Sequence, residues 1–216
     1  MVSESGFSRR ELFRRLGIVG AGTVAFPELS RVLFFQRDVM ARQAAQVTRT
    51  ADVQTLTPAE RGTLAAVCAR IVPTDQNGPG ATEAGAAQYI DRALGGWLSP
   101  SRDAYTAGLK ETDSRAQKKH GRLFAELSAI DQDAVLGDLE QSEFFALVRT
   151  HTIQGTFCDP AYGGNANFIG WDLIGYPGIR LAVTAADQRM SAPPKPVRRS
   201  AYDYAMFAAM GATHAH

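Results

Sequence analysis

A chain of 216 residues with 45% hydrophobic residues can bury one substantial core, so we expect one domain with appendages. The formal net charge of +1 gives no positive field for nucleic acid, which excludes that class of partner. The two cysteines, Cys68 and Cys158, stand far apart without Cys or His ligand spacing around them, so the sequence offers no structural zinc site.

The N-terminus, residues 1–40, is typical of an export signal. Adjacent arginines, Arg9 and Arg10, precede an apolar, glycine-rich run from Leu16 to Phe26, an order that indicates the twin-arginine route. The alternative is an ordinary basic amphipathic helix. No small-residue cleavage site follows the run directly, so the signal is either cleaved late or retained. A retained segment from Leu16 to Phe35 would associate the chain with the membrane.

A linker and then a first helix follow the signal. Residues 41–55 are polar and alanine-rich, as linkers are, and we expect the globular domain to cover 56–190. The stretch Thr57–Glu60 has the sequence of a capping box with proline at the first helical position, so a helix begins there. Pro73 ends it. Its predicted buried stripe is Leu64, Val67, Cys68 and Ile71.

A turn is predicted at residues 74–81, which are rich in Asp, Asn, Gly and Pro. Asp75 and Asn77 could supply oxygen ligands to calcium, but the closing glutamate of an EF-hand loop is missing, so we interpret the stretch as a turn. The next helix is expected to begin near Glu83 and to stop at Gly95.

Two further helices are predicted before the one that contains His151. Ser99 and Pro100 precede a helix that runs towards Gly121, and Ser128 begins another with Asp131 in its capping box. No stretch of the chain shows the alternation of a strand. The fold class is therefore predicted to be all-α.

His151 lies on the apolar stripe of the next predicted helix, at helical spacing from Phe144 and Val148, and this helix is expected to break at Gly155. One interpretation makes His151 a base or a haem ligand at an electron-transfer junction. The other makes it a neutral, buried histidine with a hydrogen bond to a nearby group, which is the commoner situation.

A loop crowded with Gly, Asn, Pro and aromatic residues follows the helix. Asp159 is expected to start a turn, the glycines permit positive φ, and the asparagines can bond backbone groups that no helix satisfies. The loop is either a protein interface, which aromatic residues favour, or a rigid structural loop. The candidate interface residues are His151, Gln154, Asp159, Tyr162, Asn165, Asn167, Phe168, Trp171 and Tyr176.

The C-terminal residues, 191–216, are predicted to form an arm. Three prolines near its start favour an extended chain, and the tyrosines, methionines and phenylalanine after them are too apolar for a free tail. We expect this arm to lie across a partner and to end in a short docked segment.

Two segments carry a family resemblance: LTPAERGTLAAVCARIVPTDQNGPGATEAG at residues 56–85 and HTIQGTFCDPAYGGNANFIGWDLIGYPG at residues 151–178. They are similar to the gluconate 2-dehydrogenase subunit 3 family, the small or gamma subunits of periplasmic flavoprotein sugar dehydrogenases. The resemblance runs roughly from Leu56 to Val183. The twin-arginine start also resembles that family.

The resemblance implies a non-catalytic accessory subunit with no cofactor of its own. Its partner would be a large FAD-containing subunit of the glucose-methanol-choline type that oxidises a sugar or polyol, with a cytochrome c or another molecule as the electron acceptor. The small subunit would escort the folded large subunit through the twin-arginine pore into the periplasm and stabilise it there. Export would also permit a disulfide between Cys68 and Cys158.

No motif for nucleotide binding, covalent haem attachment, a nucleophilic serine or a zinc protease is found in the sequence. A second hypothesis remains open on the residues alone. In it the chain is a stand-alone periplasmic ligand-binding protein or enzyme that uses His151 and the loop at Asp159.

Overall fold

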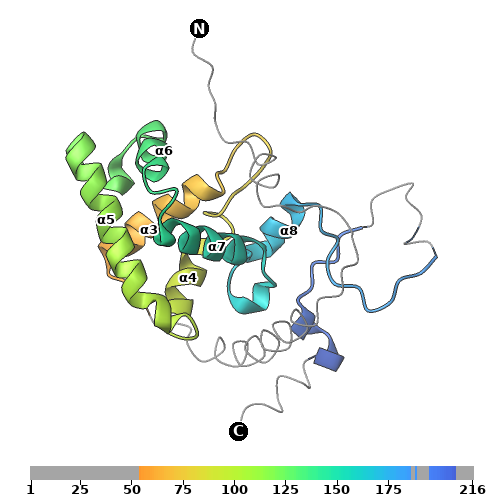
Figure 1. Ribbon diagram of the computed structural model, residues 1–216. Coiled ribbons are helices and arrows are strands. Elements are labelled where there is room, and N and C mark those ends of the chain that lie inside the picture. Colours follow the sequence, from red (N-terminus) through yellow and green to blue (C-terminus); the bar gives the residue numbers. More distant parts are fainter. Residues whose placement is uncertain (1–53, 186–187, 189–194, 208–216) are drawn as a thin grey trace, which may run out of the picture. The chain divides into compact units, whose positions relative to one another are not determined.

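The computed structural model describes residues 54–185, 188 and 195–207, so the predicted signal at 1–40 and most of the linker lie outside the described residues. Within the described ranges the chain is helical and forms no strand, which confirms the all-α prediction (Figure 1). The α-helices are α3 (Pro58–Ile71), α4 (Ala86–Leu94), α5 (Arg102–His120), α6 (Ala129–Gly137), α7 (Glu143–Phe157) and α8 (Ile169–Leu173). The 3-10 turns are η1 (Ser99–Ser101), η2 (Phe124–Glu126), η3 (Pro160–Tyr162), η4 (Ala166–Phe168) and η5 (Ala201–Asp203).

The predicted helix starts are confirmed where a side chain caps the helix. At α3 the amide of Glu60 donates to Thr57 Oγ1 over 3.3 Å, and the amide of Thr57 donates to the Glu60 carboxylate over 2.8 Å. Ser128 Oγ accepts from the amide of Asp131 at the start of α6. These bonds satisfy amides that have no partner inside the helix, so a local sequence pattern is enough to fix the start.

Helix α4 begins three residues later than expected. Residues 81–85 form a turn, and Gly85 precedes the helix with a φ of +73°. Glu83 lies in this turn, where its carboxylate accepts from the amide of Gly80 over 2.8 Å and from Thr74 Oγ1 over 2.7 Å. The predicted turn at 74–81 is present, closed by paired backbone bonds between Asp75 and Gly78.

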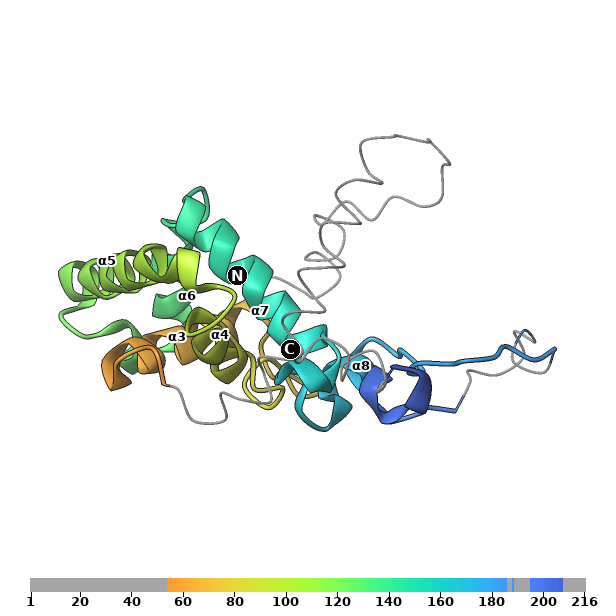
Figure 2. The ribbon, with the colours of Figure 1, turned by 90° about the horizontal axis from the view of Figure 1, so that it is seen from below.

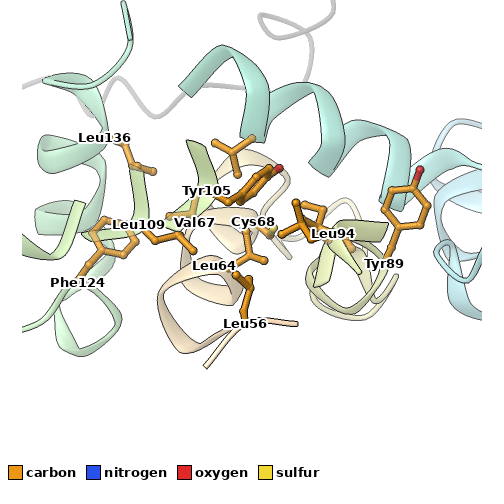
Figure 3. Close-up of a cluster of buried hydrophobic side chains, with 14 of the residues drawn as sticks. Leu56, Leu64, Val67, Cys68, Tyr89, Leu94, Tyr105, Leu109, Phe124 and Leu136 are labelled. Carbon is orange, nitrogen blue, oxygen red and sulfur yellow. The ribbon is translucent and has the colours of Figure 1, made fainter. Parts of the chain in front are cut away.

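Helices α3 to α7 form a bundle with α7 packed on α3, α4 and α5, and α7 lies next to α4 in both views (Figures 1 and 2). The core lies beneath α7, where apolar side chains from the other helices meet (Figure 3). Its largest fully buried members include Tyr105, Phe124, Leu64, Ile90, Leu94, Leu109, Val67, Val135 and Val148.

The predicted break at Gly155 is wrong, because α7 continues through this residue to Phe157. Gly155 serves close packing instead. A Cβ atom there would lie 2.8 Å from Tyr89 Cδ1 and 3.0 Å from Ala86 Cα, so only glycine lets α7 approach α4 this closely. Among the described residues no helix is long and apolar enough to cross a membrane.

Candidate partner interface

The loop after α7 closes the C-terminal end of that helix. The last carbonyl groups of a helix have no partner within it and need donors from elsewhere. Here the amide of Asn165 donates to the carbonyl of Gly155 over 2.7 Å, and Trp171 Nε1 donates to the carbonyl of Phe157 over 3.0 Å. The loop is therefore a structural cap for α7.

Asn165 is the central residue of this cap and is fully buried, with an exposed fraction of 0%. Its Nδ2 donates to the carbonyl of Cys158 over 2.8 Å, and its Oδ1 accepts from the amide of Gly170 over 2.7 Å. Its φ of +46° is a conformation that asparagine tolerates better than most residues. The prediction that the loop asparagines bond backbone groups is confirmed at Asn165.

Asp159 joins the loop to the C-terminal segment, residues 195–207. Its Oδ1 accepts from the amide of Ala161 over 2.9 Å and from Ser200 Oγ over 2.6 Å, and its Oδ2 accepts from the amide of Ala201 over 2.7 Å. Short bonds to an ionised carboxylate are stronger than neutral ones. Asp159 thus starts its turn as predicted and also holds a segment about forty residues further along, which the sequence does not indicate.

Further contacts hold the same segment on the chain. Arg198 Nη2 lies 2.6 Å from Asp172 Oδ2, and the amide of Val197 donates to the carbonyl of Pro177 over 2.7 Å. The Tyr204 hydroxyl donates to the carbonyl of Ile179 over 3.0 Å. We expected the arm to lie across a partner, but its described part docks on its own chain. We call the loop and this segment, residues 158–185 and 195–207, the platform.

The platform carries most of the exposed apolar side chains. Seven large hydrophobic residues of the described chain are exposed, and five of them belong to the platform. These five, which we call the apolar set, are Ile174, Tyr176, Leu181, Val183 and Met206. The other two, Leu123 and Ile130, lie near or on α6. Exposed apolar side chains concentrated in one part of a chain make that part a candidate contact site for other molecules.

His151 lies in the bundle, with an exposed fraction of 6%. Its Nδ1 is 2.9 Å from the Tyr105 hydroxyl, the two rings are stacked, and the Trp97 ring meets it edge-on. Burial lowers the pKa of His151, which favours the neutral ring. This is the interpretation of a buried, hydrogen-bonded histidine, and it leaves little of the side chain for a partner.

The remaining predicted interface residues fall into an inward and an outward group. Trp171 is buried and caps α7, Gln154 is half-buried on α7, and the Tyr162 ring packs edge-on against Tyr202 of the C-terminal segment. The outward group consists of the exposed Asn167 and Tyr176 and the half-buried Phe168. Some of the predicted interface residues therefore hold the loop and α7 together, and the others face outward.

The two cysteines are free thiols in the structure, so the proposed disulfide is not formed there. Cys68 Sγ lies 3.3 Å from Thr152 Oγ1 in the core, and Cys158 is half-buried at the end of α7. Burial raises the pKa of each thiol to about 12, so neither is a thiolate at neutral pH.

Residues 54–185 and 195–207 contain no group of His, Cys, Asp and Glu side chains that could hold a metal ion. The model of the family described as Gluconate 2-dehydrogenase subunit 3 matches residues 58–178, more than half of the chain. The match covers α3 to α8 and stops before the C-terminal segment. No curated protein and no solved structure matches the chain.

Proposed function

The chain belongs to the gluconate 2-dehydrogenase subunit 3 family, and we propose that it is the accessory small subunit of a periplasmic, FAD-dependent sugar or polyol dehydrogenase. The large partner subunit, of the glucose-methanol-choline type, holds the FAD and takes the hydride from the substrate. A cytochrome c accepts the electrons. The small subunit escorts the folded large subunit through the twin-arginine pathway and stabilises it.

The apolar set on the platform is the observation that supports a partner-binding role. Aromatic and methionine side chains are enriched in protein interfaces, and Tyr176 and Met206 are exposed here. Backbone and side-chain hydrogen bonds hold the loop in shape before any partner arrives. A surface that is already ordered loses less conformational entropy on binding.

The stand-alone hypothesis relied on His151 and Asp159. His151 is buried and bonded to Tyr105, and the Asp159 carboxylate accepts three hydrogen bonds from its own chain. Neither side chain is placed to act on a ligand, so no specific observation favours this second function.

The first experiment is to purify the tagged full chain from its native envelope fraction and to record a flavin spectrum of what accompanies it. We expect a larger flavoprotein in near-equal amount. Ile174→Asp should reduce the co-purified flavin, because it places a charge in the apolar set. Ile130→Asp is the matched control, since Ile130 is 81% exposed on α6. Equal flavin recovery with both variants would contradict this interface.

The escort role is tested at the signal. Replacing Arg9 and Arg10 together by lysine should leave the flavoprotein activity in the cytoplasm, because the twin-arginine route requires that pair. Replacing Arg14 and Arg15 by lysine is the control, since it makes the same chemical change a few residues later. Normal periplasmic activity with the Arg9 and Arg10 variant would refute the escort role.

A further inference from the structure

A groove of about 680 Å³ lies between α3, α4 and the part of the platform around Gly163 and Ala166. Glycine and alanine make up half of the described lining residues and come from all three elements. Apart from Leu64, the larger side chains around it are polar or charged: Gln54, Arg61, Gln88, Asp91 and Arg92. The groove is separate from the exposed apolar set of the platform.

The side chains of Arg61 and Arg92 donate hydrogen bonds to uncharged backbone carbonyl groups. Arg61 Nη1 donates to the carbonyl of Leu56 over 2.8 Å, and Arg92 donates to the carbonyls of Gly163 and Gln88. A guanidinium group has five N–H donors, so each keeps donors to spare. Within residues 54–185 and 195–207 neither arginine forms an ion pair with a carboxylate, so no described carboxylate neutralises their charges.

Among the described residues that line the groove, the one acidic side chain is already used. Asp91 is 6% exposed, and its Oδ1 accepts from the amides of Thr55 and Leu56 over 3.0 and 2.8 Å. It anchors the chain segment that leads into α3. Two guanidinium groups and one carboxylate leave the lining with a net charge of +1, counted from Arg61, Arg92 and Asp91.

We propose that this groove binds an extended, acidic peptide segment of the flavoprotein partner, with a carboxylate held by Arg61 and Arg92. Arginine binds carboxylates with paired, charge-assisted hydrogen bonds. A wall of small residues lets a peptide backbone approach closely. This second contact rests on the proposed function and lies apart from the apolar set.

Substitutions at Gln88 test whether the segment bound in the groove is acidic. Gln88 is exposed on α4, and no other contact in the groove depends on its side chain. Gln88→Glu should weaken binding of the flavoprotein about threefold, and Gln88→Lys should strengthen it about threefold, at roughly 50 mM salt. Both effects should vanish near 500 mM salt, where screening is strong. The measurement is competition of each full-length variant against the labelled chain for the native large subunit.

Gln117 provides the matched control, because it is the same residue type, exposed on α5 and outside the groove. Gln117→Glu and Gln117→Lys should leave the affinity unchanged. If both Gln88 variants change the affinity in the same direction, or no more than the Gln117 pair, the groove proposal is overturned. The proposed function survives that result, whereas a chain that binds no flavoprotein overturns both.

A photo-crosslinking residue at position 88 identifies the occupant directly. We expect the cross-linked peptide to come from the large subunit and to contain Asp or Glu. A cross-link to residues 1–53 of the same chain would mean that the chain covers its own groove, and it would overturn the proposal.

Discussion

The bundle and the platform of this protein are held together by different forces. In the bundle, side chains such as Leu64, Tyr105 and Phe124 are fully buried, and burial of apolar surface supplies the stability. In the platform, five large apolar residues stay exposed and hydrogen bonds at Asn165 and Asp159 fix the chain. Burial thus stabilises the bundle, whereas the platform keeps apolar side chains exposed, as the proposed contact with a partner would require.

The largest expected effect is in the bundle core. Phe124→Ala should lower the free energy of unfolding by about 3–5 kcal/mol, because it removes a fully buried ring and leaves a cavity. Urea unfolding of the purified chain measures this. Leu123→Ala is the neighbouring control, since Leu123 is 46% exposed and should cost less than about 0.5 kcal/mol. Similar losses for the two variants would contradict a core at Phe124.

A smaller effect is expected at the joint between the two regions. Asn165→Ala should destabilise the loop by about 2–3 kcal/mol, because the amide of Gly170 and the carbonyl of Cys158 lose their partner. Faster hydrogen exchange at the amide of Gly170 should accompany the loss.

Asn167→Ala is the control for that prediction. Asn167 shares the positive φ of Asn165 but is exposed, so it reports the cost of the backbone conformation alone. We expect about 1 kcal/mol or less. Equal effects at both asparagines would show that the buried hydrogen bonds contribute nothing.

A local effect is expected within the platform. Asp159→Asn should weaken the bonds to Ser200 and Ala201 by about 1 kcal/mol, because the acceptor loses its charge. Trypsin should then cleave faster at Arg198 and Arg199, while the urea midpoint of the bundle stays unchanged. Asp172→Asn should have less effect, because its ion pair with Arg198 is exposed. Equal cleavage of Asp159→Asn and the wild type would contradict the role of Asp159.

The smallest expected effect is a pH dependence that arises in the bundle. Burial lowers the pKa of His151 below its ordinary value of about 6.5, so below that pH the unfolded chain binds more protons than the folded chain. The free energy of unfolding should therefore fall as the pH drops from about 7 towards 5. The Tyr105 hydroxyl stays protonated throughout, because burial raises its pKa.

His151→Gln tests that contribution, since glutamine can bond to the Tyr105 hydroxyl but does not titrate. Urea unfolding at several pH values should show a shallower decline than in the wild type. Identical slopes for the two proteins would mean that His151 titrates alike in the folded and unfolded states.

Features that depend on neighbouring residues could be predicted from the sequence. The capping pattern at Thr57 and Glu60 located α3, and Asn165 was expected to bond backbone groups. Glycine was harder to interpret. Gly155 has a helical conformation, and a glycine is needed there because α4 lies too close for a Cβ atom. A lone glycine in an apolar run does not reveal whether it ends a helix or lets another one approach.

Contacts between distant residues could not be predicted. Asp91 bonds the amides of Thr55 and Leu56, and Asp159 bonds Ser200, but nothing local in the sequence marks either carboxylate as an acceptor for those groups. Likewise, the loop motif near Trp171 contained both inward and outward aromatics, and only packing against α7 separates them. The sequence thus predicted which region of the chain forms the candidate site. It did not predict which residues of that region cap α7 and which face outward.

The link between Asp159 and Ser200 also orders events during synthesis. The bundle ends at Phe157, so all its helices are synthesised before Ser200, and at about 5–20 residues per second the 41 residues from Asp159 to Ser200 take roughly two to eight seconds. A chain stopped before Ser200 would contain the whole bundle but lack the segment that Asp159 holds. The platform is therefore complete only once synthesis has passed residue 207.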